Sequence, residues 1–477
     1  MSSNSNVRRQ ELKSTMSMRS IWAVAFGSSV GWGAFILPGD WLTSSGTLGA
    51  TLGIIIGGLL MLIIAVAYGA LTQKFPVSGG EFAFIYQSFG KYTSFIASWF
   101  LVLGYICIVA LNASAFSLLF KFVAPGFLEV GYLYTIAGWD VYIMEVILSS
   151  LILIVFAYIS IRGSGLSGTL QFYFCLFMAL IVGGLFLTSF FVGDFSFENA
   201  KPLFNEEVGI LTSIILIVAI APWMYVGFDS IPQAAEEFNF DASNTFKLIV
   251  FGIVASILTY VAMILLTSWI YPDQNAIDGA TWVTGSVVLE SMGALGMLLL
   301  AVAISFGIFT GLNGFYLSSS RLTFALGRAN FIPKAFANLH PRFNTPYIAV
   351  VFVMIVCLTA PWLGRTALSW VVDMSSVGVS IAFFATSMVA VKFFSQRENF
   401  NKVYVIFGAL GALISLVFLA LLLIPSSPAA LTMPSYVALI AWAVLGIIFF
   451  IYQFKTLNSL TTRELDFLIL KKKPRVK

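Results

Sequence analysis

Long apolar runs, each about as long as a lipid bilayer is thick, recur along the whole of this 477-residue chain. One of them, TLGATLGIIIGGLLMLIIAVAYGALT at residues 47–72, holds no charged side chain. A helix needs roughly 20 mostly apolar residues to cross the hydrocarbon core, whereas strands of a membrane barrel alternate in polarity. The runs therefore predict an all-α integral membrane protein. Because only 10% of the residues are charged, we expect no separate soluble domain.

Hydropathy predicts twelve transmembrane helices. Their expected ranges are 20–44, 47–72, 92–120, 141–161, 167–192, 208–235, 245–270, 293–327, 346–363, 367–391, 403–424 and 434–454. We divide the chain into a tail at 1–19, a first set of five helices at 20–192, a second set at 208–391, two last helices at 403–454 and a basic tail at 455–477.

The basic residues fix the expected orientation. If the N-terminus is cytoplasmic, 22 of the 25 lysines and arginines lie in cytoplasmic segments, and 25 − 22 = 3 lie outside, namely Lys121, Lys201 and Arg365. Basic side chains resist translocation. We therefore expect a multi-pass plasma (inner) membrane protein with both termini in the cytoplasm. The tail KKKPRVK is expected to set topology or contact anionic lipid, and we expect no nucleic acid partner.

Two of the predicted helices contain helix breakers at membrane depth. The first reads GSSVGWGAFILPGD at residues 27–40 and the second reads APWMYVGFDS at residues 221–230. An unsatisfied backbone group in lipid costs several kcal/mol, so an irregular backbone is tolerated only where it lines a cavity or is covered by protein. Corresponding interruptions in two halves of a transporter point to a binding site at the membrane midplane. Kinks for close packing are the competing interpretation.

The broken ends suggest which ligand fits. A half-helix that starts at a break offers free N–H groups, which suit a carboxylate, whereas the carbonyls left without partners suit an ammonium group. Both ends of an amino acid could be held in this way. We therefore predict a binding site for a small zwitterion or amine.

Three motifs resemble those of one known family. They are GxxxGxGxFxxPG at residues 27–39, WxxxGFDxxxxxxEE at residues 223–237 and SRLxxALxRxxxxP at residues 320–333. In this order they resemble the amino acid/polyamine/organocation permeases over residues 20–455. The resemblance implies a five-plus-five inverted-repeat transporter fold with discontinuous helices 1 and 6, which works by alternating access.

The resemblance also implies a set of substrate-binding residues. They are Ser28, Ser29, Val30, Gly31, Trp32 and Gly33 on the first break, Leu101, Val102 and Ile106 on the third helix, Trp223, Tyr225, Val226, Gly227, Phe228 and Asp229 on the sixth, and Phe315 on the eighth. Trp32 departs from the family motif, which commonly has a small residue there. The indole either points away from the cavity, or fills part of it, or stacks on a cationic substrate.

Asp229 is the carboxylate that we place beside a helix break and away from the membrane surfaces. Intramembrane acids are costly and are functional candidates. We expect Asp229 to pair with an amine or to bind and release a proton during transport. The competing interpretation is that it caps the second half-helix.

The sequence leaves the coupling ion open. Some proton-coupled relatives carry a lysine on the fifth helix, and the position that matches by counting is Met178. Ser318 and Ser319 are possible sodium ligands, although such hydroxyls usually bond their own helix. We expect no cofactor and no confident metal site, with H⁺ favoured over Na⁺ as the coupling ion.

Two further patterns carry structural predictions. Gly49, Gly53 and Gly57 form a stripe that favours close helix packing. For Glu236 and Glu237 two interpretations have equal weight, namely pairing with Arg321 or Arg328 in an inner gate and solvated surface charge. Asn112 and Asn313 are expected to bond between helices. The amphipathic segment 79–92 is expected to lie along the inner membrane surface.

The function that we expect from the sequence is therefore transport of an amino acid. The alternative is an amine or polyamine transporter or exchanger with Asp229 as the cation partner. An enzyme is not expected, because the single histidine, His340, leaves no His-based catalytic group at membrane depth. A nontransporting sensor would need a soluble domain. The expected partners are a small-molecule amino acid or amine and the lipid bilayer, and the protein is expected to be a monomer or a homodimer.

Overall fold

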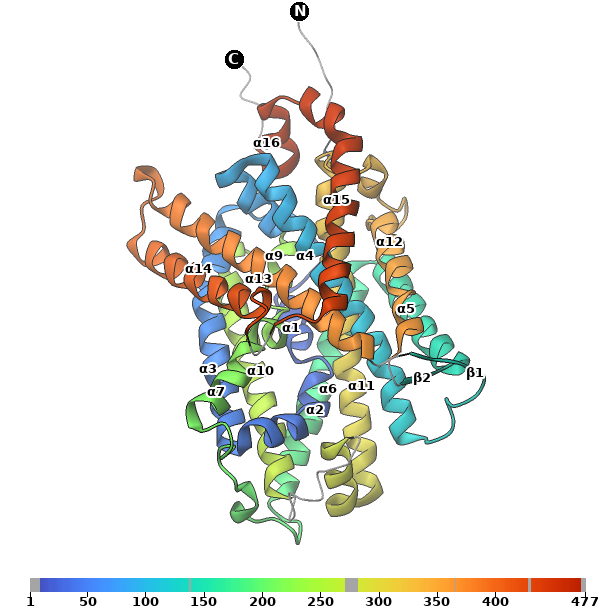
Figure 1. The fold of residues 1–477 in the computed structure, drawn as a ribbon. Coiled ribbons are helices and arrows are strands. Elements are labelled where there is room, and N and C mark those ends of the chain that lie inside the picture. The colour runs from blue at the N-terminus through green and yellow to red at the C-terminus, as the bar shows by residue number, and fades with distance from the viewer. Residues whose placement is uncertain (1–8, 137–138, 271–281, 365, 428–429, 473–477) are drawn as a thin grey trace, which may run out of the picture.

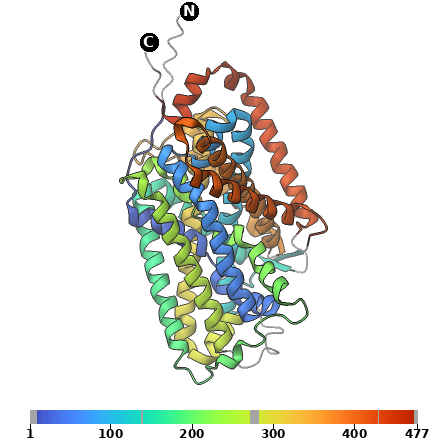
Figure 2. The ribbon, with the colours of Figure 1, turned by 90° about the vertical axis from the view of Figure 1, so that its left-hand side faces the viewer.

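The computed structural model of the protein describes residues 9–136, 139–270, 282–364, 366–427 and 430–472. Within these ranges, nine helices are long and apolar enough to cross a membrane. The long helices form a bundle (Figures 1 and 2). The expectation for Arg365 lies outside the described residues, as do those for residues 1–8 and 473–477 of the tails.

The helices have the following bounds. They are α1 Met18–Val30, α2 Gly33–Ile36, α3 Pro38–Lys74, α4 Gly80–Val123, α5 Ile143–Arg162, α6 Ser164–Ser189, α7 Ile210–Ala219, α8 Ala221–Tyr225, α9 Ser230–Gln233, α10 Thr245–Trp269, α11 Val283–Arg328, α12 Tyr347–Cys357, α13 Thr366–Phe394, α14 Lys402–Leu423, α15 Met433–Ser459 and α16 Thr462–Leu470. Short 3₁₀ helices include η2 Ala235–Glu237, which directly follows α9.

Two helices run through boundaries that hydropathy placed between separate segments. α3 continues from Pro38 to Lys74 and bends at Gly46, whose φ is 70°. α4 joins the predicted amphipathic segment 79–92 to the third predicted span and bends at Gly90, whose φ is 78°. Glycine has no Cβ and therefore tolerates a positive φ. Each helix can therefore bend at its glycine and continue on the other side of it.

A short hairpin departs from the all-α prediction. Strands β1 (Tyr132–Ile136) and β2 (Trp139–Tyr142) pair antiparallel between α4 and α5. Residues 141 and 142, with which the predicted fourth span begins, belong to β2, and α5 begins two residues later at Ile143. Aromatic and β-branched residues suit such a strand pair, but hydropathy alone counted them as part of the apolar run.

The glycine stripe on α3 packs against α7 and α8, as the sequence predicted. A Cβ on Gly53 would lie 2.5 Å from Cβ of Ile217, and a Cβ on Gly57 would lie 2.8 Å from Cβ of Ala221. Figure 2 shows α3 among closely spaced helices. Small residues let two helix backbones approach this closely.

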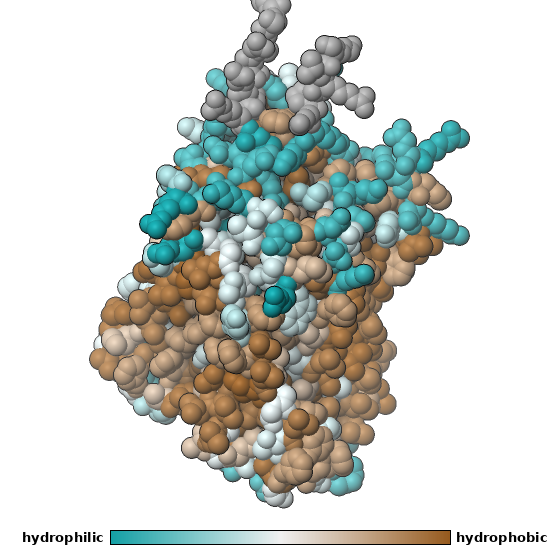
Figure 3. Space-filling model, turned by 180° about the vertical axis from the view of Figure 1, so that it is seen from behind, coloured by the Kyte–Doolittle hydropathy of each residue, from teal (hydrophilic) through white to brown (hydrophobic). Residues whose placement is uncertain are grey.

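Hydrophilic residues gather at one end of the molecule. Figure 3 shows them at the end where α16 lies in Figure 1, while hydrophobic residues cover most of the remainder of that face. The N-terminal segment and α16 meet there, because Arg9 Nε donates to the carbonyl of Leu468 at 3.1 Å. We call this end of the molecule the α16 end.

A buried ion-pair network closes the α16 end. Glu236 accepts from Arg9 at 2.8 Å and from Arg328 at 2.9 Å, and Glu237 accepts from Arg321 at 2.7 Å. The predicted pairing is confirmed, and Arg9 is a partner that the sequence did not suggest. Burial opposes the charge on Glu236, but Arg328 and Arg9 outweigh it and lower the pKa of Glu236 to about 2. Because that pKa is lowered, the contribution of the network to stability is present at neutral pH and lost only in strong acid.

The stripe yields a direct test. Substituting Gly53→Leu should force α3 away from α7 and lower the unfolding temperature of the purified protein, because overpacking costs about 1–3 kcal/mol. Gly183→Leu on α6 is the matched control, since nothing lies within 4 Å of a Cβ there. Equal unfolding temperatures for both variants would contradict the close packing of α3 on α7.

Candidate functional site

The two helix interruptions touch each other. The first break lies at residues 31–32, between α1 and α2, and the second at residues 226–229, between α8 and α9. Gly227 has a φ of 133°, and a Cβ on it would lie 2.6 Å from the backbone nitrogen of Ser29. Only a glycine permits this conformation and this distance together.

One hydroxyl joins the two breaks. Tyr260 of α10 places its hydroxyl oxygen 3.0 Å from the carbonyl oxygen of Ser29, 3.2 Å from that of Val30 and 3.3 Å from that of Met224. Ser29 Oγ also donates to the carbonyl of Tyr225 at 3.0 Å. These carbonyls belong to the last turns of α1 and α8, where helical N–H partners run out. Because carbonyl oxygens carry partial negative charge, their convergence gives this region a negative electrostatic potential. The Tyr260 hydroxyl has only one hydrogen to donate to the three oxygens.

Asp229 lies at the second break and is fully buried. Its Oδ1 accepts from the N–H of Gly227 at 2.8 Å and its Oδ2 from the hydroxyl of Tyr105 at 2.8 Å. Asp229 is the N-cap residue of α9, but its side chain bonds to Gly227 and Tyr105 and makes no capping hydrogen bond to α9. The ring of Phe315 lies 5.7 Å from that of Tyr105, which brings α11 to the same place. Sequence reasoning missed Tyr105, although it follows the predicted Leu101 by one helical turn.

The position of Trp32 was left open by the sequence. Its indole lies edge-on to that of Trp223, with ring centroids 5.9 Å apart, and is only 9% exposed. Gly33 lies directly under the same Trp223, since a Cβ there would be 3.1 Å from Cη2. The two indoles therefore form one aromatic cluster on the α2 side of the first break.

Three of the predicted residues have side chains that contact other helices. Tyr225 donates its hydroxyl to the carbonyl of Ile54 on α3 at 2.7 Å, and the ring of Phe228 packs on Tyr68. The side chain of Ser28 lies between Gly314 of α11 and Gly227 of the second break, with its Cβ 2.7 Å from the Cβ position of Gly227. Contact of these residues with a substrate stays a prediction. Val226 is buried in an extended conformation within the second break.

Helix α4 contributes a polar side chain that the sequence assigned differently. Asn112 Nδ2 bonds the carbonyl of Ile108 in its own helix, so the interhelical prediction for Asn112 is wrong. Its buried Oδ1 has no hydrogen-bond partner among the described residues and lies 3.9 Å from the Cβ position of Gly31. Leu101, Val102 and Ile106 are buried on the same helix, and their contact with a substrate stays a prediction.

A second polar cluster joins α1, α6 and α11. Gln171 Nε2 lies 3.2 Å from the carbonyl of Ala23 and 3.1 Å from that of Thr310, while its Oε1 accepts from Asn313 at 2.8 Å. The interhelical prediction for Asn313 is thus confirmed. The amide of Gln171, and not buried Met178, is the side chain of α6 that bridges carbonyls of α1 and α11.

The two serines considered as sodium ligands bond their own helix. Ser318 Oγ donates to the carbonyl of Gly314 at 2.9 Å and Ser319 Oγ to that of Phe315 at 2.5 Å. This is the usual arrangement for hydroxyls in membrane helices.

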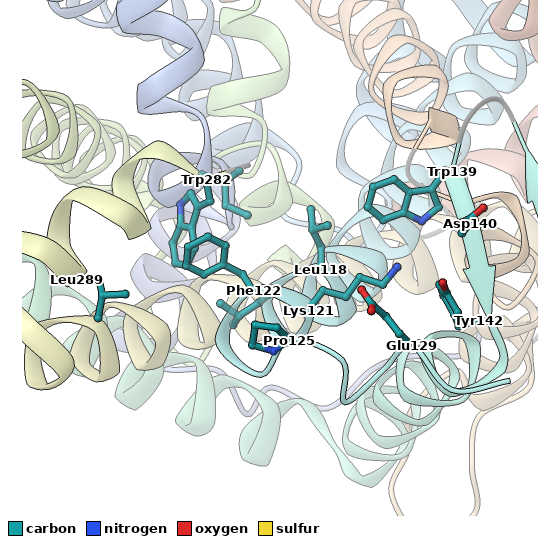
Figure 4. Close-up of a pocket in the computed structure, with 12 residues that line it drawn as sticks. Leu118, Lys121, Phe122, Pro125, Glu129, Trp139, Asp140, Tyr142, Trp282 and Leu289 are labelled. Atoms are coloured by element: carbon teal, nitrogen blue, oxygen red, sulfur yellow. The ribbon is translucent and has the colours of Figure 1, made fainter. Parts of the chain in front are cut away.

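A cavity of about 620 Å³ lies between the end of α2 at Ile36, the last turns of α4, the hairpin and the start of α11. Lys121 extends into it, with Nζ 4.4 Å from the ring centroid of Trp139 and 2.9 Å from Glu145 Oε2 (Figure 4). Trp282, which also lines the cavity, donates Nε1 to the carbonyl of Phe35 at 2.8 Å and so holds α2 in place. None of the site residues predicted from sequence lines this cavity.

A family model described as amino acid permease matches residues 16–455. The branched-chain amino acid permease BcaP of Lactococcus lactis subsp. cremoris is 26% identical over 81% of this chain and 83% of its own length.

Two other relatives carry different substrate names. The methylthioribose transporter of Bacillus subtilis is 23% identical over 71% of this chain and 73% of its own length. The cationic amino acid transporter 6 of Arabidopsis thaliana, a chloroplastic protein, is 24% identical over 79% of this chain and 65% of its own length. Since the family model covers nearly all of the sequence, the chain belongs to the amino acid permease family, within the amino acid/polyamine/organocation superfamily.

Proposed function

We propose that this permease is a secondary active transporter that carries an amino acid by alternating access around a site where the two helix breaks meet. In this proposal the chain crosses the plasma membrane twelve times, with an inverted repeat of five helices and the α16 end in the cytoplasm. The observation that carries the proposal is the convergence of carbonyls from α1 and α8 on the hydroxyl of Tyr260.

The backbone at the breaks suits the two ends of an amino acid. The first N–H groups of α2, beginning at Gly33, have no acceptor within their helix and are the proposed partners of the carboxylate. The carbonyls of Ser29 and Val30 at the end of α1, together with Oδ1 of Asn112, are the proposed partners of the ammonium group. Binding through peptide groups replaces the water that a zwitterion leaves behind in the aqueous phase.

The surroundings favour an apolar side chain on the substrate. Trp32, Trp223 and Phe315 place aromatic rings near the breaks, and both carboxylate oxygens of Asp229 already accept hydrogen bonds. We therefore propose a neutral aliphatic amino acid, in agreement with the name of BcaP. The second candidate is an amine or a cationic amino acid with Asp229 as its partner, in agreement with the name of the Arabidopsis relative.

We propose protons as the coupling ion in preference to sodium. Gln171 Nε2 donates to the carbonyls of Ala23 on α1 and Thr310 on α11. Carbonyl oxygens that converge in this way could stabilise a cation, but here they face the N–H groups of a neutral side chain. An N–H donor there already satisfies the carbonyls that a sodium ion would need as ligands.

Reconstituted protein provides the test of the proposed function. Vesicles preloaded with unlabelled leucine should accumulate labelled leucine, isoleucine or valine by counterflow, and these amino acids should raise the unfolding temperature of the purified protein. Labelled arginine and putrescine probe the second candidate. If none of these compounds undergoes counterflow or shifts the unfolding temperature, the proposed substrate class is wrong.

Asp229→Asn separates the two candidates. We expect leucine counterflow to persist within about tenfold of wild type, because the amide keeps one acceptor for Gly227 or Tyr105 and a lost hydrogen bond costs about 0.5–1.5 kcal/mol. Selective loss of arginine or putrescine counterflow would instead support the cationic candidate. Asp194→Asn, in an exposed loop, is the matched control.

Trp32→Ser tests whether the aromatic cluster limits substrate size. Removing the indole opens space beside Trp223, so we expect phenylalanine to become a better competitor of leucine counterflow and leucine itself to bind less tightly. Competition curves for both amino acids measure the change. Trp362→Ser, at a side chain that is 44% exposed, is the control. An unchanged ratio of the two affinities would place Trp32 outside the substrate contact.

A further inference from the structure

A second buried carboxylate lies near Asp229. Glu81, in the first turn of α4, has no exposed surface, and Gln233 of α9 donates Nε2 to its Oε2. Its Oε1 has no hydrogen-bond partner among the described residues. The sequence placed this segment on the inner membrane surface and gave Glu81 no role.

Several buried polar atoms of this region lack partners within the described part of the chain. They are Gln233 Oε1 and Ser230 Oγ of α9 and the hydroxyl of Tyr68 of α3. The two hydroxyls can donate or accept. Gln233 Oε1 is an acceptor only, so it needs a proton from another group. A buried acceptor without a donor destabilises the folded protein, and here two such acceptors belong to side chains that are already bonded to each other.

Among the described residues, the ionisable groups that interact with Glu81 include no cation. They are Asp229 at the second break, Tyr68 of α3 and Tyr105 of α4. Tyr105 donates to Asp229 and also interacts with Glu81, so it adjoins both carboxylates. Two carboxylates buried among neutral groups are stable only when a cation or a proton joins them.

The arginines of the α16 end form ion pairs with other carboxylates. Arg328 pairs with Glu236, and both contact the backbone of Ser78, three residues before Glu81. Arg321 pairs with Glu237. On the other side of the same helical segment, Asp466 of α16 accepts from Tyr86. These interactions leave the arginines of the α16 end engaged and the Glu81 cluster without a counter-charge from them.

We propose that Glu81 and Asp229, with Tyr105 and Gln233 beside them, form a proton-binding site of the transport cycle that adjoins the substrate site at the second break and extends from it towards the start of α4. One H⁺ adds to the Glu81 carboxylate to give the neutral acid, and no other bond forms or breaks. The new O–H adds a donor beside Gln233, whose unpartnered Oε1 can only accept. The inference rests on the proposed transport function and adds where its coupling proton binds.

The position of Glu81 connects this site to the second break. Gly80, its neighbour, lies so close to α9 that a Cβ there would be 2.6 Å from Cβ of Pro232. α9 is the segment that follows the second break and leads into Glu236 and Glu237. Gain or loss of one proton on Glu81 therefore changes the hydrogen bonds that hold α9 against the start of α4. Movement of α9 would in turn open or close the α16 end.

Infrared difference spectroscopy tests proton binding without knowledge of the substrate. Wild-type protein in lipid, titrated from acid to alkaline pH, should show loss of the carbonyl stretch of a buried protonated carboxylic acid. Glu81→Gln should remove a large part of that band. Glu290→Gln, the same change at an exposed carboxylate, should leave it intact. A full-sized band in Glu81→Gln would overturn the proposal even if leucine transport is found.

Transport assays test the role of the site. The assays use labelled leucine and vesicles that contain a pH-sensitive dye. Glu81→Gln should show leucine counterflow within a few-fold of the wild-type rate. Its leucine uptake driven by a proton gradient should be at least tenfold slower than that of wild type. Glu81→Asp should recover part of the driven uptake. Wild-type-like driven uptake by Glu81→Gln would overturn the proposal, as would wild-type uptake that follows a sodium gradient and ignores pH. Unfolding temperatures within a few degrees of wild type show that each variant is folded.

A failure of the proposed transport function gives other results than a failure of the proposed proton-binding site. If wild-type protein shows no counterflow of leucine, arginine or putrescine, the proposed function fails, while the infrared titration still reports whether Glu81 binds a proton.

Discussion

The need to satisfy every backbone hydrogen bond at membrane depth is the constraint on which this structure depends. The chain meets it with helices almost everywhere and departs from it at two breaks that lie against each other. There, Tyr260 donates to carbonyls at the end of α1 and of α8, and Ser29 donates to Tyr225. Because the breaks cover each other, the irregular backbone is sheltered from lipid. The same groups become available to a polar guest.

Polar interactions in the core occur at three levels. Gln171 and Asn313 join α1, α6 and α11 on one side of the breaks, while Asp229 and Tyr105 lie at the second break itself. Beyond them, Glu81 and Gln233 lead towards the ion pairs of the α16 end. Every level includes side chains from segments far apart in the sequence.

Much of the architecture was predictable because hydropathy and glycine placement are local properties. The glycine stripe of α3, the pairing of Glu236 with Arg328 and the two helix breaks all followed from the sequence. The hairpin was missed because its aromatic residues resemble those of an apolar helix. Tyr105, Glu81, Gln171 and Arg9 were missed for another reason. Each owes its position to a partner more than 100 residues away, and no local pattern marks that partner.

The sequence by itself determined that the chain is a membrane protein of mostly apolar helices, because transfer of apolar residues into lipid depends on composition and length alone. It also marked where helical hydrogen bonding fails, since glycine and proline act on their own backbone. Only the tertiary structure determined which side chains lie beside these interruptions of the helices. Three features depend on contacts between helices that are far apart in the sequence. They are the packing of Trp32 on Trp223, the hydrogen bonds to both carboxylate oxygens of Asp229 and the burial of Glu81. No local sequence pattern marks these contacts.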